Sequence, residues 1–224
     1  MLFSNKIIVG FSTGLCFGIL VSFILSTTHV MGQSTGFTYY TKWGSLGEAD
    51  GQFDGQNDVD FFSGRVYVAD YANHRIQIFD PDGNFITKFG QGGEGDGQFH
   101  KASALSIDSE GNIYVADQFN YRVQKFTNDG KFIKAWGSRG TADGQFHGPS
   151  GLSIDANDNI YVTDKNNNRV QIFSNDGQFI RKFGVAGAGD GQLNGPEGVG
   201  VDKDTGTVYV ADTGNTRIQV FKPL

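Results

Sequence analysis

Short runs of alternating apolar and polar residues fill the chain after residue 33, and they recur in a fixed order. Gly-Gln-Phe or Gly-Gln-Leu begins at Gly51, Gly97, Gly144 and Gly191, at spacings of 46, 47 and 47 residues. Each copy precedes apolar runs rich in β-branched and aromatic residues, with Gly, Asp and Asn between them. A period of two in runs of this composition is typical of strands, and this part of the chain shows no sustained helical stripe. We therefore expect an all-β protein made of tandem repeats.

Each repeat predicts four antiparallel strands, apart from the last, which ends after its third. The expected strands begin near residues 59, 66, 75 and 85 in the first repeat, 105, 113, 122 and 132 in the second, 152, 160, 169 and 179 in the third, and 199, 208 and 217 in the fourth. Four such strands per repeat of about this length are the pattern of a β-propeller blade.

Residues 37–44, FTYYTKWG, resemble the fourth strands of the repeats, such as FIKAWG at Phe132. This segment is expected to complete the last blade and so to close a ring of four blades, which protects the edge strands. An open or oligomeric arrangement of the blades is the alternative.

Residues 1–32 have a different pattern. Ile7–Leu25 carries no charge, and Lys6 precedes it. A helix of this length spans about 28 Å, close to the ~30 Å hydrocarbon core of a bilayer. The segment is predicted to be either a signal peptide cleaved before Gln33 or a retained transmembrane anchor. Both alternatives place the domain at 33–224 outside the cytoplasm, secreted or anchored through residues 7–25.

Composition narrows the classes of function. The 224 residues carry a formal net charge of −6, with 33 Gly, 20 Phe and a single Cys. The acidic balance argues against nucleic-acid binding, because such proteins present clustered Lys and Arg. One Cys excludes an internal disulfide and a Cys-rich zinc module.

The motifs within the repeats resemble those of the NHL-repeat family over residues 37–224. They are D-G-Q-F, P-S-G-L-S-I-D at Pro149–Asp155, N-I-Y-V-T-D, and N-x-R-[IV]-Q-x-F. The resemblance implies a β-propeller, although NHL domains mostly have six blades. It also implies several unlike functions, including protein or RNA recognition, extracellular sensing and metal-dependent lyase activity.

An Asp and an Arg recur around the turn between the second and third strands of every repeat. The Asp ends one strand and the Arg begins its neighbour, so the two can form a charge-assisted bond across the hairpin. Four copies at one structural position indicate architecture rather than catalysis. The pairs are Asp70/Arg75, Asp117/Arg122, Asp164/Arg169 and Asp212/Arg217.

Candidate functional residues are expected where the repeats differ, on the face from which the loops before the first strand and after the second strand emerge. The residue after each Gly-Gln-Phe/Leu is Asp54, His100, His147 or Asn194, and Asp60 takes the place of a small residue on the innermost strand. Imidazole and carboxylate are ligands for zinc or a similar divalent metal. The alternative is that these are solvated polar loop residues, so no cofactor is expected and a metal remains a secondary hypothesis.

Large side chains occupy the loops after the second strands on the same face: Tyr71, His74, Phe119, Tyr121 and Lys165. Exposed aromatics near a concave mouth favour a recognition surface, and packing against the neighbouring blade is the alternative. We therefore expect a non-catalytic module that binds a protein, peptide or glycan. The competing hypothesis is a metal-dependent lyase or hydrolase using Asp54, His100 and His147 around an ion at the channel mouth.

Overall fold

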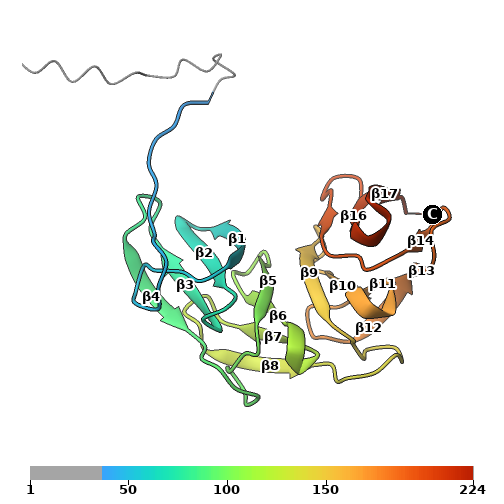
Figure 1. Cartoon of the computed structure of the whole chain (residues 1–224), viewed down its shortest axis with the longest axis horizontal. Helices are drawn as coiled ribbons and strands as arrows, with labels where there is room; N and C mark the ends of the chain where they lie inside the picture. Colours follow the sequence, from blue (N-terminus) through green and yellow to red (C-terminus); the bar gives the residue numbers. More distant parts are fainter. Residues whose placement is uncertain (1–36, 224) are drawn as a thin grey trace, which may run out of the picture. The chain divides into compact units, whose positions relative to one another are not determined.

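The computed structural model describes residues 37–223, and the chain divides after Tyr40 into two units, of which the second begins at Thr41. The second unit contains all the strands described here (Figure 1). The predicted signal peptide or anchor at 1–32, including Ile7–Leu25, lies outside the described residues. Between residues 37 and 223, the structure contains no helix of the length and hydropathy needed to span a membrane.

The second unit is a series of antiparallel sheets, one for each repeat. The first sheet contains β1 (Gln56–Phe62), β2 (Arg65–Asp70), β3 (Arg75–Phe79) and β4 (Phe85–Phe89); the second contains β5 (Ala102–Ile107), β6 (Ile113–Asp117), β7 (Arg122–Phe126) and β8 (Phe132–Trp136). The third contains β9 (Pro149–Ile154), β10 (Ile160–Asp164), β11 (Arg169–Phe173) and β12 (Phe179–Phe183), and the fourth contains β15 (Val199–Val201), β16 (Val208–Asp212) and β17 (Arg217–Phe221).

Short elements recur at the same places within and between these sheets. The 3-10 turns η1 (Gln118–Asn120), η2 (Lys165–Asn167) and η3 (Thr213–Asn215) connect the second and third strands of the last three sheets. A parallel pair, β13 (Val185–Ala186) and β14 (Gln192–Leu193), bridges the loop before the fourth sheet. Single parallel bridges at the same place in the earlier repeats show that all four linking loops share one conformation: Leu46 with Phe53, Gly92 with Phe99, and Arg139 with Phe146.

Consecutive sheets pack face to face, and their inner strands meet in the order β1, β5, β9, β15. Figure 1 shows the sheets in this sequence order. Apolar residues from both partners fill each junction; Ile76 and Ile78 of β3, for example, join Leu105 of β5 and Phe126 of β7 in one buried cluster. The all-β prediction of four propeller blades, one per repeat, is therefore confirmed.

Closure of the ring by the N-terminal strand is the part of the prediction that the structure does not show. Residues 37–45 form no strand, and the fourth sheet has only β15, β16 and β17 in the described part of the chain. Trp43 instead packs on the first sheet, 6.0 Å from the ring of Phe79. The segment is thus held by its aromatic side chain, without backbone pairing to β17.

The Asp–Arg pairs predicted to be architectural are present in all four sheets. Asp70, Asp117, Asp164 and Asp212 are each fully buried and lie 2.8–2.9 Å from the Arg Nε of the next strand. Each guanidinium also donates to backbone carbonyls of the linking loop; Arg169, for example, reaches Thr141, Ala142 and Gln145. This network ties the linker to the hairpin and so fixes the loops that carry the candidate site.

Candidate functional site

The loops before the inner strands and after the second strands lie on one face of the sheets, as the sequence predicts. Backbone bonds join them directly: Phe119 N–H donates to the carbonyl of His100, and Asn166 N–H donates to that of His147. The same pairing recurs in the first and last repeats, where Ala72 bonds to Asp54 and Gly214 to Asn194. The variable side chains of each repeat are therefore presented side by side.

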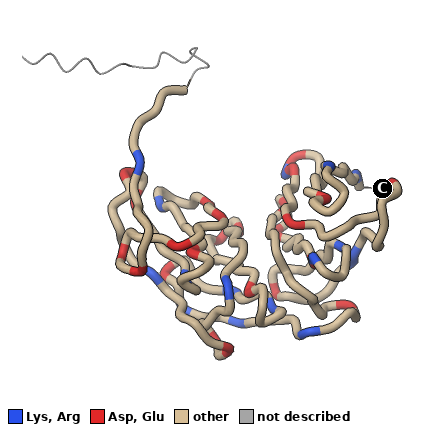
Figure 2. Tube along the Cα trace, in the orientation of Figure 1, with Lys and Arg blue, Asp and Glu red and all other residues tan. Residues whose placement is uncertain are grey.

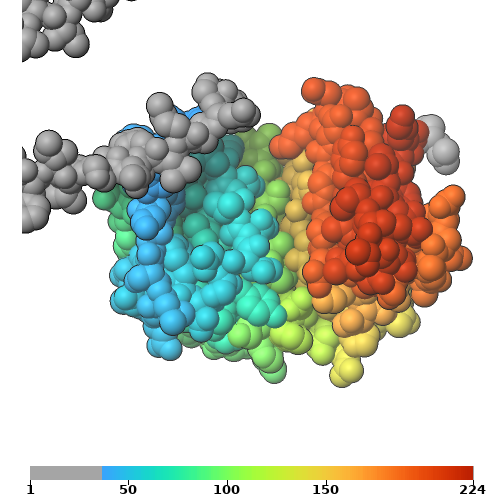
Figure 3. Space-filling model, turned by 45° about the horizontal axis from the view of Figure 1, so that its top comes forward, coloured from blue at the N-terminus to red at the C-terminus, as the bar shows by residue number. Residues whose placement is uncertain are grey.

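A cavity of about 780 Å³, here called the central groove, opens between these loops and the inner strands. Residues of all four sheets or their loops line it, from Asp58 of β1 to Glu197 just before β15. Figure 3 shows the groove region as a hollow between the first and last sheets, with the middle sheets beneath it. Four of the five residues predicted for the binding surface are among its lining residues: Tyr71, Phe119, Tyr121 and Lys165.

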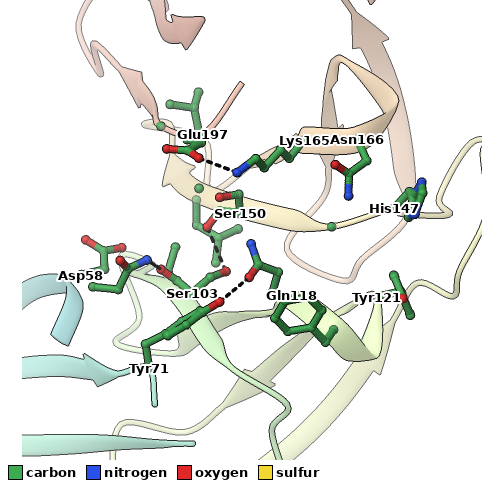
Figure 4. A pocket seen from close by; sticks show the side chains of 18 residues that line it. Asp58, Tyr71, Ser103, Gln118, Tyr121, His147, Ser150, Lys165, Asn166 and Glu197 are labelled. Carbon is green, nitrogen blue, oxygen red and sulfur yellow. Dashed lines mark hydrogen bonds and ion pairs between the residues drawn. The ribbon is translucent and has the colours of Figure 1, made fainter. Parts of the chain in front are cut away.

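Two side-chain contacts hold neighbouring blades together at the rim of the groove (Figure 4). Tyr71 Oη donates to Oε1 of Gln118 at 2.8 Å, which links the first repeat to the second. Lys165 Nζ lies 2.5 Å from Oε1 of Glu197, which links the third repeat to the fourth. Both Lys165 and Glu197 remain more than a third exposed, so the pair is accessible to a charged ligand.

The aromatic residues of the loops divide between packing and exposure. The ring of Tyr121 lies 6.2 Å from that of His147 in the next repeat, and the guanidinium of Arg139 lies 5.4 Å from the same tyrosine ring. Phe119 rests on His100 at 5.1 Å but is 45% exposed. Both alternatives left by the sequence thus apply, and Phe119 supplies the open apolar surface.

His74 is not among the residues that line the groove, and it binds the loop of the next repeat. Its Nδ1 accepts a hydrogen bond of 3.0 Å from the backbone N–H of Lys101, and its ring lies 6.0 Å from that of His100. Burial, followed by the charges of Lys101 and His100, lowers the pKa of His74. A neutral imidazole fits this role, because Nδ1 has to keep its lone pair to accept.

Burial also raises the pKa values of two groove residues. The pKa of the Asp58 carboxyl is raised by desolvation, against which the N–H groups of Leu105 and Val59 donate to it. Desolvation likewise raises the pKa of Tyr71, so its hydroxyl stays protonated and can donate to Gln118. The lining of the groove thus offers the carboxyl group of Asp58, several amides and hydroxyls, and the lysine–glutamate pair at the rim.

The residues proposed as metal ligands occupy equivalent places but do not converge. The backbone N–H groups of Asp54, His100, His147 and Asn194 donate to the buried Asp of their own repeat at 2.7–2.9 Å. Within residues 37–223, no three His, Cys, Asp or Glu side chains are grouped so that they could hold an ion. His147 alone of this set lines the groove.

The Asp60 carboxylate binds backbone N–H groups and does not stand free to bind a cation. It accepts the N–H of Ile107 in β5 at 3.0 Å and that of its neighbour Phe61 at 2.7 Å. Asp58 makes the corresponding bond to Leu105 at 2.9 Å, so two carboxylates of β1 bind the inner strand of the next blade. The described structure therefore gives no support to Asp60 as a cation ligand.

Sequence reasoning missed several lining residues. These are Asn57, Asp58, Ser103, Gln118, Ser150, Asn166 and Glu197. Two of them carried a usable signal, because Gln118 follows the motif Asp directly and Glu197 replaces the serine of Pro-Ser-Gly. The others lie on strands or turns, and whether their side chains point into the groove depends on how consecutive sheets pack.

Figure 2 shows acidic and basic residues interspersed along the sheets that surround the groove.

Two family models match the chain over its repeats. The NHL repeat model matches residues 146–173 and 193–221, and a family described as a 6-bladed beta-propeller, DUF5128, matches residues 52–136. No curated protein sequence matches the chain.

Solved structures with a similar fold differ widely in sequence. Virginiamycin B lyase from Staphylococcus aureus has a TM-score of 0.55 at 18% identity, covering 75% of this chain and 56% of its own. A structural genomics protein of unknown function from Bacteroides thetaiotaomicron has a TM-score of 0.62 at 19% identity, covering 74% of this chain and 46% of its own. The computationally designed Ika4 protein has a TM-score of 0.55 at 14% identity, covering 82% of this chain and 99% of its own.

The chain thus spans about half the length of the two natural proteins, and likeness at this identity shows the fold alone. The repeat motifs, the sheet order and the matching family models agree. The family models, with NHL repeats at residues 146–173 and 193–221 and a propeller family at 52–136, support a β-propeller of the NHL-repeat type.

Proposed function

We propose that this chain is a recognition module that binds a protein segment or peptide in the central groove. The observation that carries the proposal is the composition of the groove, to which all four repeats contribute side chains. Six of its lining residues come from the loops after the second strands, where the repeats differ. Loops held by a rigid scaffold are where binding residues concentrate.

The chemistry of the groove suits a peptide. A half-exposed Phe119 can pack against an apolar side chain, while Asn57, Gln118 and Asn166 offer amides to a peptide backbone. The Lys165–Glu197 pair can exchange its partner for a charged group of the ligand. An aromatic anchor surrounded by polar groups is the arrangement in which a few residues supply most of the binding free energy.

The test is a selection for ligands on the full-length chain. A random peptide library displayed on phage is panned on the wild-type protein, and a glycan array is probed with the same preparation. We expect peptides to be enriched, and Phe119→Ser to weaken their binding by about tenfold or more, since the anchor residue of an interface contributes a large share of its affinity.

Ile180→Ser is the matched control, because Ile180 is 48% exposed and lies on the outer strand β12, away from the groove. This variant should bind the enriched peptides as the wild type does. Equal loss in both variants, or peptides that are insensitive to Phe119→Ser, would refute groove recognition. Binding confined to the glycan array would move the ligand class to carbohydrate.

We also propose that the propeller is located outside the cytoplasm. The support is the uncharged run at 7–25 preceded by Lys6. A fusion of alkaline phosphatase to the C-terminus of the full chain should be active, since that enzyme matures only in an oxidising compartment. An inactive fusion that accumulates in the cytoplasm would contradict the proposal, and N-terminal sequencing distinguishes cleavage from retention.

A further inference from the structure

Every junction between blades joins two apolar surfaces of different composition. The surface that a sheet turns toward the next repeat is here called its forward face, and the surface toward the preceding repeat its rear face. In the first junction the forward face of the first sheet, with Tyr67, Ile76 and Ile78, meets the rear face of the second, with Leu105 and Ile107. All five side chains are at least 94% buried.

The two other junctions use the same repeat positions. Val123 takes the place of Ile76 and meets Leu152 and Ile154 in the second junction. Val170 takes that place in the third junction and meets the fourth sheet, with Val199 and Val201 packed alongside. A forward face is thus covered by a rear face three times in succession.

The first sheet has a rear face that the described chain leaves partly open. Val59 and Phe61 occupy the positions of Leu105 and Ile107, yet they are 62% and 60% exposed. The outer part of this face is already organised, because Val68 and Phe79 are buried in a small cluster with Phe53. The face therefore has the form of a junction surface with its inner half uncovered.

The fourth sheet has a forward face in the same condition. Ile218 and Val220 correspond to Ile76 and Ile78, and they are 62% and 53% exposed. Tyr209, which corresponds to the buried Tyr67, is also exposed. One of the two open faces is a forward face and the other is a rear face. Each is therefore the kind of surface that covers the other at the inner junctions.

The seat of Trp43 adds a second observation. At the first two junctions, the aromatic residue that ends an outer strand packs beneath the Asp-Gly turn of the next sheet: Phe89 beneath Gly130, and Trp136 beneath Gly177. Trp43 packs beneath Gly83 of the first sheet in the same way. Trp43 thus takes the place of the last residue in the outer strand of a preceding blade. In the first three sheets the outer strand pairs with the third strand, and β17 is a third strand without such a partner in the described part of the chain.

We propose that two copies of this chain associate through these faces. The forward face of the fourth sheet of each copy covers the rear face of the first sheet of the other, beside the Trp43 segment. Two such contacts are equivalent under a two-fold axis, so the assembly closes with no face left over. The two faces are both exposed in the single chain, so they do not cover each other within it. A second copy supplies the missing partner for each of them.

The test uses a pair of opposite charges on the full-length chain, solubilised in a nonionic detergent. Val59→Glu alters the rear face and Ile218→Lys the forward face. Position 218 is preferred to 220, because the second repeat carries a buried lysine, Lys125, at the equivalent of 220. Light scattering should report a dimer of the wild type, and each variant alone should dissociate at least a hundredfold more readily, since an unpaired charge in an apolar contact is strongly unfavourable.

Mixing the two variants restores one unchanged contact and, in the other contact, places the introduced lysine opposite the introduced glutamate. The I218K and V59E chains, carrying different tags, should therefore co-purify as a pair. Circular dichroism and thermal unfolding of each variant establish that it remains folded. A monomeric wild type, or single variants that stay dimeric, would overturn the proposal. So would a V59E/I218K double variant that regains stability as a monomer, because that result shows closure within one chain.

Discussion

At the residue scale, the feature that organises the molecule is a buried carboxylate that accepts bonds from four groups at once. Asp164 receives the N–H of His147, the side-chain amides of Asn167 and Gln171, and the guanidinium of Arg169. It is fully buried. One carboxylate thus fixes a loop residue of the groove, a turn and a strand.

Asp164→Asn should therefore be strongly destabilising. The substitution leaves the Arg169 guanidinium buried without its counter-charge, which costs about 3 kcal/mol or more in the free energy of unfolding. Asp50→Asn is the control, because the Asp50–Lys88 pair is about half exposed and should contribute less than about 1 kcal/mol. Urea denaturation measures both, and similar losses in the two variants would contradict this account.

The equivalent carboxylate of the last repeat gives a pH dependence. Desolvation opposes the ionisation of Asp212, but Asn215, the N–H of Asn194, Arg217 and Gln219 all donate to it and together lower its pKa to about 2 from an ordinary 3.8. A group whose pKa is lowered by folding stabilises the protein above its unfolded pKa, and this contribution is lost as the pH falls toward the folded pKa. Asp212→Asn should thus be less stable than the wild type above pH 4, and the difference should shrink between about pH 4 and pH 2.

Urea midpoints at several pH values test this expectation. A difference that stays constant from pH 6 down to pH 2 would show that the carboxylate is not the titrating group.

The recurrence of Asp and Arg in the sequence was sufficient to predict the ion pairs, because four copies at one structural position indicate architecture rather than a special role for one of them. The role of Asp60 could not be predicted, because it depends on an N–H of the neighbouring blade.

At the scale of elements, the hairpin turns before the outer strands serve as seats for aromatic rings of the preceding repeat. Gly177 has a φ of +75°, and a Cβ built there would lie 2.6 Å from the ring of Trp136. Glycine is required at this position both by the backbone and by the neighbouring ring.

Gly177→Ala should therefore destabilise the third blade by more than the backbone conformation alone explains. The ring contact adds about 1–3 kcal/mol of overpacking to a backbone cost of about 1 kcal/mol. Gly191→Ala is a matched control, since Gly191 has a φ of +74° and nothing within 4 Å of a built Cβ. Equal losses of unfolding free energy in the two variants would show that the seat of the ring is unimportant.

Most of the strands could be predicted because their alternation and turn residues repeat. The start of β1 at Gln56 was not predicted, because Gln56, Asn57 and Asp58 are polar and read as a loop. In the fold Gln56 and Asp58 pair with β2, Asn57 lies at an irregularity between them, and Asp58 bonds to the next blade. The segment at 37–44 differs from its expected role for the opposite reason: its pattern matches an outer strand, but pairing requires β17 beside it.

At the scale of the whole molecule, identical repeat positions differ in stability according to whether another blade covers them. Ile76→Ala, at a fully buried site, should lower the free energy of unfolding by about 3 kcal/mol. Ile218→Ala, at the equivalent exposed site, should cost less than about 1 kcal/mol when measured at dilutions where the chain is monomeric. Chemical denaturation at low protein concentration checks both, and comparable losses would mean that the fourth sheet is covered within a single chain.

The central groove was only partly predictable. Tyr71, Phe119, Tyr121 and Lys165 were found because they are unusual side chains in otherwise polar loops, and the repeats place those loops on one face. Glu197 and Asp58 come from opposite ends of the repeat array, and their joining in one groove follows from the curvature of the stacked sheets. No local pattern in the sequence encodes that curvature.

The seat of Trp43 beneath Gly83 has a consequence for how such chains change over generations. The first three repeats each have a glycine turn, at Gly83, Gly130 or Gly177, that seats an aromatic ring of the segment before it, so these repeats share one way of joining to what precedes them. An in-frame duplication or loss of one of these three repeats should therefore keep the ring-and-turn contact at the new junction. Recombination can therefore change the number of repeats without requiring a new kind of junction. New binding loops can arise on an added repeat while the loops of the existing repeats keep their ligand.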